Sequence, residues 1–312
     1  MKAAVPDDEF IALWRKLKSA AAIAKYLKVT ERAVHDRRVR VMKRHGILLG
    51  SNSPNAVYVT VKDYISRATA EIDNGTICVA SDAHYWDNEP SVAHQAFVKV
   101  IKKLNPAMVI MNGDVFDGAT VSRYPRQHWG SKHPTVKQEL EAVRDRLHEI
   151  EKAAKNAKLV WTLGNHDQRF ESKLVSNVPE YEGVVGFTLK EHFPRWLHCM
   201  SLMINENIMV KHRYRTSVHA TYLNALHGGV SIVTGHLHRL QATTFSDYNG
   251  TRFGVDTGTL GDVDGDHMGY GEDNPKNHCS GFVVLTIKDG ELLYPEFCFV
   301  HKDVAYFRGK PV

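Results

Sequence analysis

Residues 159–167 read LVWTLGNHD, a run suited to a buried β-strand that passes directly into Gly-Asn-His-Asp. The same pattern, a short apolar run that ends in polar side chains, occurs four more times along the chain. These apolar runs are residues 76–80, 107–111, 208–211 and 231–234. The polar residues that follow the five runs are Asp82, His84, Asp114, Asp117, Asn165, His166, His212, His236 and His238. Short apolar runs bounded by turn residues predict buried strands.

Helical patterns separate several of these strands, with residues 91–104 before the second and residues 136–154 before the third. Such alternation predicts an α/β sheet. Because polar residues just past the carboxyl ends of strands meet at one edge of a sheet, we expect the five groups to lie together.

The residue types in these groups favour metal chemistry. Two divalent cations about 3.5–4 Å apart need a bridging carboxylate and several neutral ligands. Asp, Asn and His suit Mn²⁺, Fe or Zn²⁺. We expect Gly113, Gly164 and Gly235 to allow a sharp turn that directs each ligand toward the metals.

The ordered set G-D-x-x-D, G-N-H-D and G-H-x-H resembles the calcineurin-like metallophosphoesterase superfamily over residues 76–260. The resemblance implies a four-layer α-β-β-α sandwich in residues 76–312 and hydrolysis of a phosphate ester. It also implies two divalent metal ions, for which Mn²⁺ is the favoured identity and Fe, Zn²⁺ or Mg²⁺ are alternatives. The ligands of the first metal would be Asp82, His84, Asp114 and His238, with Asp114 bridging to a second metal held by Asn165, His212 and His236.

The same resemblance assigns catalytic roles to two further residues. His166 would stabilise the transition state or protonate the leaving oxygen, and Asp117 would orient His166. A metal-bridging hydroxide would attack phosphorus in line. One ligand has an alternative, since His219 follows His212 closely; we favour His212 because it directly follows an apolar strand.

Cationic and aromatic residues near these motifs are candidates for substrate binding. The loop after Asp117 holds Arg123, Tyr124 and Arg126, while Arg169 and Arg213 follow other motifs. Cations bind phosphate and aromatic rings stack on bases, although a solvated loop or ordinary salt bridges explain them equally well.

The positive charge of the chain is concentrated at its start. Residues 1–50 hold 12 Lys and Arg against 5 Asp and Glu, whereas the remaining residues hold 28 against 30. Three short helices are predicted there, capped by Asp7, Ser19 and Thr30. They resemble a helix-turn-helix whose buried positions include Ile23, Val29 and Val34. We expect it to bind DNA through Arg32, Arg37, Arg38 and Arg40; the alternative is a basic helical cap on the enzyme.

We therefore expect residues 1–50 to form a DNA-binding domain, 51–75 a joining segment and 76–312 a metal-dependent phosphodiesterase or nuclease. The layout resembles phage- or prophage-encoded phosphoesterases. Two alternatives are a phosphomonoesterase of a protein or small molecule, and a DNA-binding regulator with a structural metal site. No run of about 18 apolar residues exists, so no membrane span is expected. The sequence shows no secretory signal and no C-x-x-C pair, which favours the cytoplasm.

Overall fold

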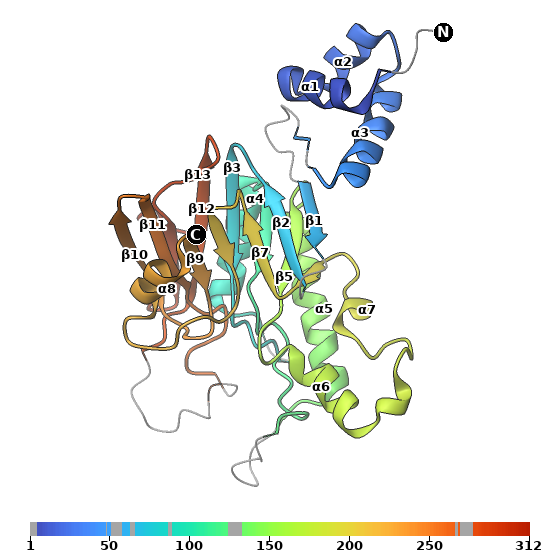
Figure 1. The fold of residues 1–312 in the computed structure, drawn as a ribbon. Helices are drawn as coiled ribbons and strands as arrows, with labels where there is room; N and C mark the ends of the chain where they lie inside the picture. Colours follow the sequence, from blue (N-terminus) through green and yellow to red (C-terminus); the bar gives the residue numbers. More distant parts are fainter. Residues whose placement is uncertain are drawn as a thin grey trace. The chain divides into compact units, whose positions relative to one another are not determined.

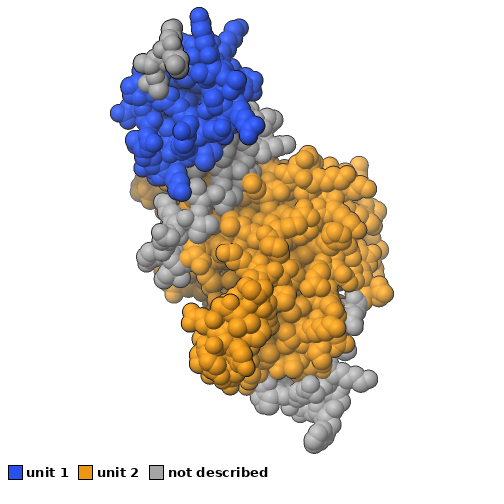
Figure 2. Space-filling model, turned by 90° about the vertical axis from the view of Figure 1, so that its right-hand side faces the viewer, with its two compact units in different colours: residues 1–58 blue, residues 59–312 orange. Residues whose placement is uncertain are grey.

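The computed structural model describes residues 5–47, 49–50, 58–62, 66–86, 89–123, 133–265, 268 and 277–312. The chain divides into two compact units, residues 1–58 and residues 59–312 (Figure 2). Among the described helices, none combines the length and the apolarity needed to cross a membrane.

The first unit contains three helices, α1 (Asp7–Leu17), α2 (Ala20–Leu27) and α3 (Glu31–His45). Its core is built from apolar side chains of all three, including Phe10, Trp14, Ile23, Val34 and Val41. The predicted caps of α2 and α3 are present. The Ser19 hydroxyl accepts the N–H of Ala22, and the Thr30 hydroxyl accepts that of Ala33.

Two local predictions for this unit are wrong. Asp7 does not cap α1 but is its first residue, after Pro6. Its carboxylate instead lies 2.8 Å from Arg44 Nη1, since the ends of α1 and α3 meet. Val29 is 47% exposed rather than buried, because the turn after α2 directs it away from the core.

Two of the four arginines predicted to contact DNA instead contact other parts of the helical unit. Arg38 is only 5% exposed, and its guanidinium lies 4.7 Å from the centre of the Trp14 ring. Arg37 donates a hydrogen bond to the Val5 carbonyl and lies 3.5 Å from Asp7. Both therefore join α3 to α1, and only Arg32 and Arg40 of the predicted set are exposed.

The second unit is a sandwich of two β-sheets. The nine-stranded sheet has the order β16-β15-β14-β12-β3-β4-β5-β6, with β13 paired to β12. Its parallel strands are β3 (Gly75–Ala80), β4 (Met108–Met111), β5 (Lys158–Thr162) and β6 (Leu197–Cys199). Its remaining strands are β12 (Gly281–Lys288), β13 (Glu291–Leu292), β14 (Glu296–His301), β15 (Val304–Phe307) and β16 (Lys310–Pro311).

The seven-stranded sheet has the order β1-β2-β7-β8-β9-β11-β10. Its strands are β1 (Tyr58–Lys62), β2 (Arg67–Glu71), β7 (Ser201–Ile204), β8 (Ile208–Val210), β9 (Ser231–Thr234), β10 (Leu240–Asp247) and β11 (Gly250–Thr257). The segment expected to join the domains thus contributes two strands. β2 pairs in parallel with β7 and buries Ala68 and Ala70, so it is part of the sandwich.

Helices cover the outer faces of both sheets (Figure 1). α4 (Val92–Leu104) and α5 (Val136–Ala153) pack on the nine-stranded sheet, where Phe97, Val143 and Leu147 join its core. α8 (Ala220–Gly228) packs on β9, β10 and β11. The result is the predicted four-layer α-β-β-α sandwich. Three further helices follow β5: α6 (Gln168–Asn177), η1 (Pro179–Tyr181) and α7 (Leu189–His192).

Candidate metal centre

The nine polar residues predicted from strand ends do lie together, but they come from two sheets rather than one. β3, β4 and β5 of the nine-stranded sheet are followed by Asp82, His84, Asp114, Asp117, Asn165 and His166. β8 and β9 of the seven-stranded sheet are followed by His212, His236 and His238. The centre therefore lies where the ends of the two sheets meet.

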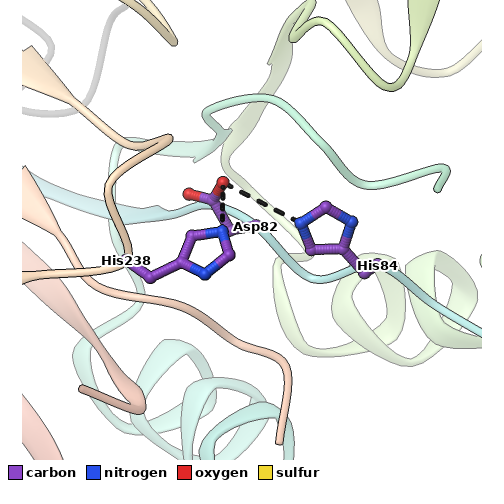
Figure 3. Close-up of side chains that lie close together, drawn as sticks. All are labelled: Asp82, His84 and His238. Carbon is purple, nitrogen blue, oxygen red and sulfur yellow. Dashed lines mark ion pairs between the residues drawn. The ribbon is translucent and has the colours of Figure 1, made fainter. Parts of the chain in front are cut away.

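One group with metal-ligand geometry consists of Asp82, His84 and His238 (Figure 3). Asp82 Oδ1 lies 3.1 Å from His238 Nε2 and 4.0 Å from His84 Nε2. His84 Nδ1 lies 2.9 Å from Asp117 Oδ1, so its other nitrogen faces the centre. All three side chains are buried.

A second group consists of Asp114, His212 and His236. His212 Nε2 lies 3.0 Å from Asp114 Oδ2 and 3.8 Å from Asp82 Oδ1, so it connects the two groups. Its Nδ1 donates to the Asn112 carbonyl at 2.7 Å, which leaves Nε2 free to bind a metal. His219, the alternative ligand, is exposed before α8. The structure therefore places His212 in the centre.

The buried carboxylates of this centre favour positive charge between them. Burial opposes ionisation of Asp82, yet the charges of His238 and His212 hold its pKa at about 2. Burial alone would lower the pKa of His212, but Asp114 and Asp82 raise it to about 10. Burial and the nearby His212 lower the pKa of His236 to about 4, so His236 is neutral as metal binding requires.

These residues fit a pair of divalent cations. Asp82 Oδ1 faces imidazole nitrogens of three histidines within 4.0 Å, a charge arrangement that a metal ion satisfies. The buried amide oxygen Asn165 Oδ1 accepts no hydrogen bond from the described residues, as expected for an oxygen reserved for a metal. The oxygen and nitrogen donors, without thiolate, match Mn²⁺, Fe or Zn²⁺.

Asp117 links one candidate ligand to His166. Its Oδ1 lies 2.6 Å from His166 Nδ1 and 2.9 Å from His84 Nδ1, and its Oδ2 accepts the indole N–H of Trp86. Arg169 Nη2 lies 2.9 Å from His166 Nε2. A guanidinium can only donate, so His166 carries its proton on Nδ1, toward Asp117. No sequence motif singles out Trp86, so its contact with Asp117 is visible only in the structure.

Five of the candidate ligands have a left-handed backbone, which is uncommon for residues other than glycine. Their φ angles are 52° for Asp82, 44° for His84, 51° for Asp114, 72° for His236 and 55° for His238. Backbone strain of this kind costs about 1–3 kcal/mol per residue and concentrates at functional sites. It turns each side chain sharply out of its strand.

The glycines of the motifs matter mainly because they are small. A Cβ on Gly113 would collide with the His212 ring, and one on Gly164 would collide with the Asp114 carboxylate. A Cβ on Gly235 would lie 2.6 Å from Asp82 Oδ2. Only Gly113 has a left-handed backbone, with φ of 87°. The predicted reason, freedom to turn, therefore holds for Gly113 alone.

Asp167 holds the two central loops together, a role that the sequence analysis did not assign. Its Oδ1 accepts the backbone N–H groups of Val115 and Phe116, each at 3.0 Å. Its Oδ2 accepts from Asp114 N at 2.9 Å, Gly164 N at 2.7 Å and the Trp161 indole at 3.0 Å. Its position as the last residue of G-N-H-D was the only available signal.

The residues predicted to bind substrate do not share one environment in the structure. Arg169 contacts His166, and its Nη1 donates to the Asp117 carbonyl at 2.9 Å. Arg123 and Arg213 are exposed. Tyr124 and Arg126 lie outside the described residues. A further buried carboxylate, Glu139, accepts from Gly118 N and Ala119 N and so fixes the loop after Asp117.

Comparison with known proteins places the chain among phosphoesterases. Residues 75–281 match the family model described as calcineurin-like phosphoesterase. No curated protein matches the sequence. Two similar solved structures are Vps29 of Entamoeba histolytica complexed with Zn²⁺ and a dimetal phosphatase of Danio rerio. The Vps29 structure is 13% identical in sequence, with a TM-score of 0.40, and the match covers 76% of this chain and 98% of that one. The phosphatase structure is 10% identical, with a TM-score of 0.37, and the match covers 76% of this chain and 97% of that one.

Replacing Asp114 should remove both metals. Asp114→Ala deletes the carboxylate predicted to bridge them, so metal analysis after Mn²⁺ loading and dialysis should find neither ion bound. His219→Ala is the matched control and should retain both, because His219 is exposed. Full metal content in Asp114→Ala would show that Asp114 is not the bridge.

Asp167→Asn should lower the free energy of unfolding by about 2–4 kcal/mol, measured by urea denaturation. The amide has only one acceptor oxygen. Its NH₂ group would face backbone N–H groups that now donate to the carboxylate, so these donors would lose their acceptor. Asp145→Asn, on the exposed face of α5, controls for loss of charge and should have little effect. Equal stability of the two variants would show that Asp167 does not stabilise these loops.

Proposed function

This chain belongs to the calcineurin-like phosphoesterase family, and from that we propose that it is a metal-dependent phosphodiesterase that cleaves nucleic acid. Hydrolysis of a phosphate ester is the activity of the family, so the chain is a phosphate-ester hydrolase. The observation that carries the nucleic-acid proposal is the basic charge of residues 1–50, 12 Lys and Arg against 5 Asp and Glu.

Seven side chains would hold the two metals, which we propose to be Mn²⁺. They are Asp82, His84, Asp114, Asn165, His212, His236 and His238. When bound, such a pair of cations activates water and neutralises charge that develops on the phosphate. The histidines keep their orientation through their second nitrogens, as the His84 contact with Asp117 and the His212 contact with Asn112 illustrate.

His166 would supply a proton to the leaving oxygen. Its Nε2 accepts from Arg169 in this structure, so Arg169 must turn toward another acceptor before Nε2 can carry a proton. A phosphate oxygen of the substrate is such an acceptor, and a guanidinium binds it strongly. Asp117 keeps Nδ1 protonated and stabilises the imidazolium that protonation of Nε2 produces.

The helical unit would bind DNA through α3, in the manner of a helix-turn-helix. Helices α2 and α3 are joined by a short turn at Lys28, which has a left-handed backbone. The face of α3 turned away from the core carries Arg32, Arg40 and Lys43, all exposed. Arg37 and Arg38 are excluded from this surface because they pack against α1.

His166→Ala should lower kcat about 10²–10⁴-fold while both metals remain bound, since that is the usual contribution of an acid–base group. Asp117→Asn should cause a smaller loss. Turnover of bis-p-nitrophenyl phosphate, measured together with metal content, checks both. His148→Ala, on the exposed face of α5, is the histidine control. Loss of metal from His166→Ala would mean that His166 is a ligand.

The proposed function is tested with Mn²⁺ and a panel of single-stranded DNA, duplex DNA, RNA, bis-p-nitrophenyl phosphate and a phosphomonoester. We expect hydrolysis of the diesters and of at least one nucleic acid. A variant with Arg32, Arg40 and Lys43 changed to Ala should reduce the slope of log affinity against log salt. Each lost phosphate contact on duplex DNA reduces that slope by about 0.9.

The matched control changes Lys102, Lys152 and Lys155, three exposed cations of the second unit, to Ala. It removes the same number of positive charges as the α3 variant, but it should leave the slope of log affinity against log salt unchanged. Equal slopes for the two triple variants would contradict DNA binding by α3. Preferential hydrolysis of the monoester would contradict the phosphodiesterase proposal itself.

A further inference from the structure

A cationic loop flanks His212, and its residues other than His212 belong to neither candidate ligand group. It comprises residues 211–218, of which Arg213, Tyr214 and Arg215 are exposed to solvent. The Lys211 ammonium lies 5.2 Å from the centre of the Tyr214 ring, and the Arg215 guanidinium lies 5.4 Å from it. One aromatic ring therefore contacts two cations through cation–π interactions.

The charge of this loop is not neutralised locally. Lys211, Arg213 and Arg215 form no ion pair with a carboxylate of the described residues. Like charges brought together at a surface repel one another unless an anion lies between them. The arrangement is thus complementary to a ligand with more than one negative charge.

The loop is held in place by the fold. Arg215 N donates to Oδ1 of Asn224, a fully buried side chain of α8. Arg239 Nη1 donates to the carbonyls of Ser217 and Val218 at 2.9 and 3.2 Å. Lys211 N donates to the Val233 carbonyl in β9. A surface fixed in this way loses little conformational entropy when it binds a ligand.

The loop is also close to the reacting centre. Tyr214 follows the candidate ligand His212 by two residues, so their Cα atoms are at most about 7 Å apart. A polymer whose scissile phosphate lies at the metals would bring its adjacent phosphates to Lys211 and Arg215. Tyr214 is 38% exposed, so it is accessible to an unpaired base of such a strand.

We propose that Lys211, Tyr214 and Arg215 form a binding site for a single polynucleotide strand where it leaves the metal centre. The inference rests on the proposed function and adds to it a subsite that distinguishes a strand from a small diester. Tyr214 positions both cations, and the cations bind the phosphates that flank the scissile one. Single-strand binding generally combines a cationic track with aromatic rings in this way.

The test compares kcat/KM for a single-stranded oligothymidylate with kcat/KM for bis-p-nitrophenyl phosphate, using the full chain loaded with Mn²⁺. Tyr214→Ala, Tyr214→Leu and Arg215→Ala should each reduce the ratio of the two values about fivefold, the upper end for an exposed charge contact. The change should appear in KM for the oligonucleotide. Tyr214→Phe should keep the wild-type ratio, because phenylalanine retains the aromatic ring. If Tyr214 served only as apolar packing, Tyr214→Leu would keep the wild-type ratio as well.

Salt dependence provides a second measurement. Arg215→Ala should reduce the slope of log affinity for oligothymidylate against log salt by about 0.7, the value for one phosphate of a single strand. Tyr248→Ala and Lys155→Ala, at exposed positions away from the loop, are the controls. Wild-type ratios and slopes in the Tyr214 and Arg215 variants would overturn the proposed subsite alone. Hydrolysis of the small diester without any action of the wild-type enzyme on nucleic acid would overturn the proposed function and the subsite together.

Discussion

The metal centre depends on one carboxylate, that of Asp167, which accepts hydrogen bonds from five N–H groups. Three of its donors are consecutive backbone groups of the loop after β4, and the others belong to β5 and the loop that follows it. A carboxylate can satisfy this many donors only when it is ionised and fixed. The strained backbone of Asp114 persists because its neighbours are held in this manner.

Asp117 fixes part of the centre in the same way, because its carboxylate contacts two of the histidines. It contacts His84, His166 and Trp86, so one carboxylate fixes a candidate metal ligand relative to His166. A shift of either histidine would change the other. The proposed metal binding and the proposed proton transfer would therefore be coupled through Asp117.

Much of the centre could be predicted from sequence because its signal is local. Each candidate ligand lies within four residues of the end of a strand, and apolar runs such as residues 231–234 are visible without knowledge of the fold. What could not be predicted depends on contacts between distant segments. Strand pairing places β8 and β9 in a different sheet from β3, and only the packing of α3 on α1 separates Arg38, which is buried, from Arg32. The role of Asp167 required knowledge of which loops meet.

The origin of the ligands in two sheets has a consequence beyond catalysis. Asp82, Asp114 and Asn165 extend from the nine-stranded sheet, while His212 and His238 extend from the seven-stranded one. Metal ions held by these residues would cross-link the two sheets, and ligands that bind only the native state stabilise it by mass action. Without them, the charges of Asp82 and Asp114 are balanced only by nearby histidines such as His212. A cell deprived of the metal would consequently degrade the enzyme faster as well as lose its activity, so the abundance of the protein would follow the supply of its cofactor.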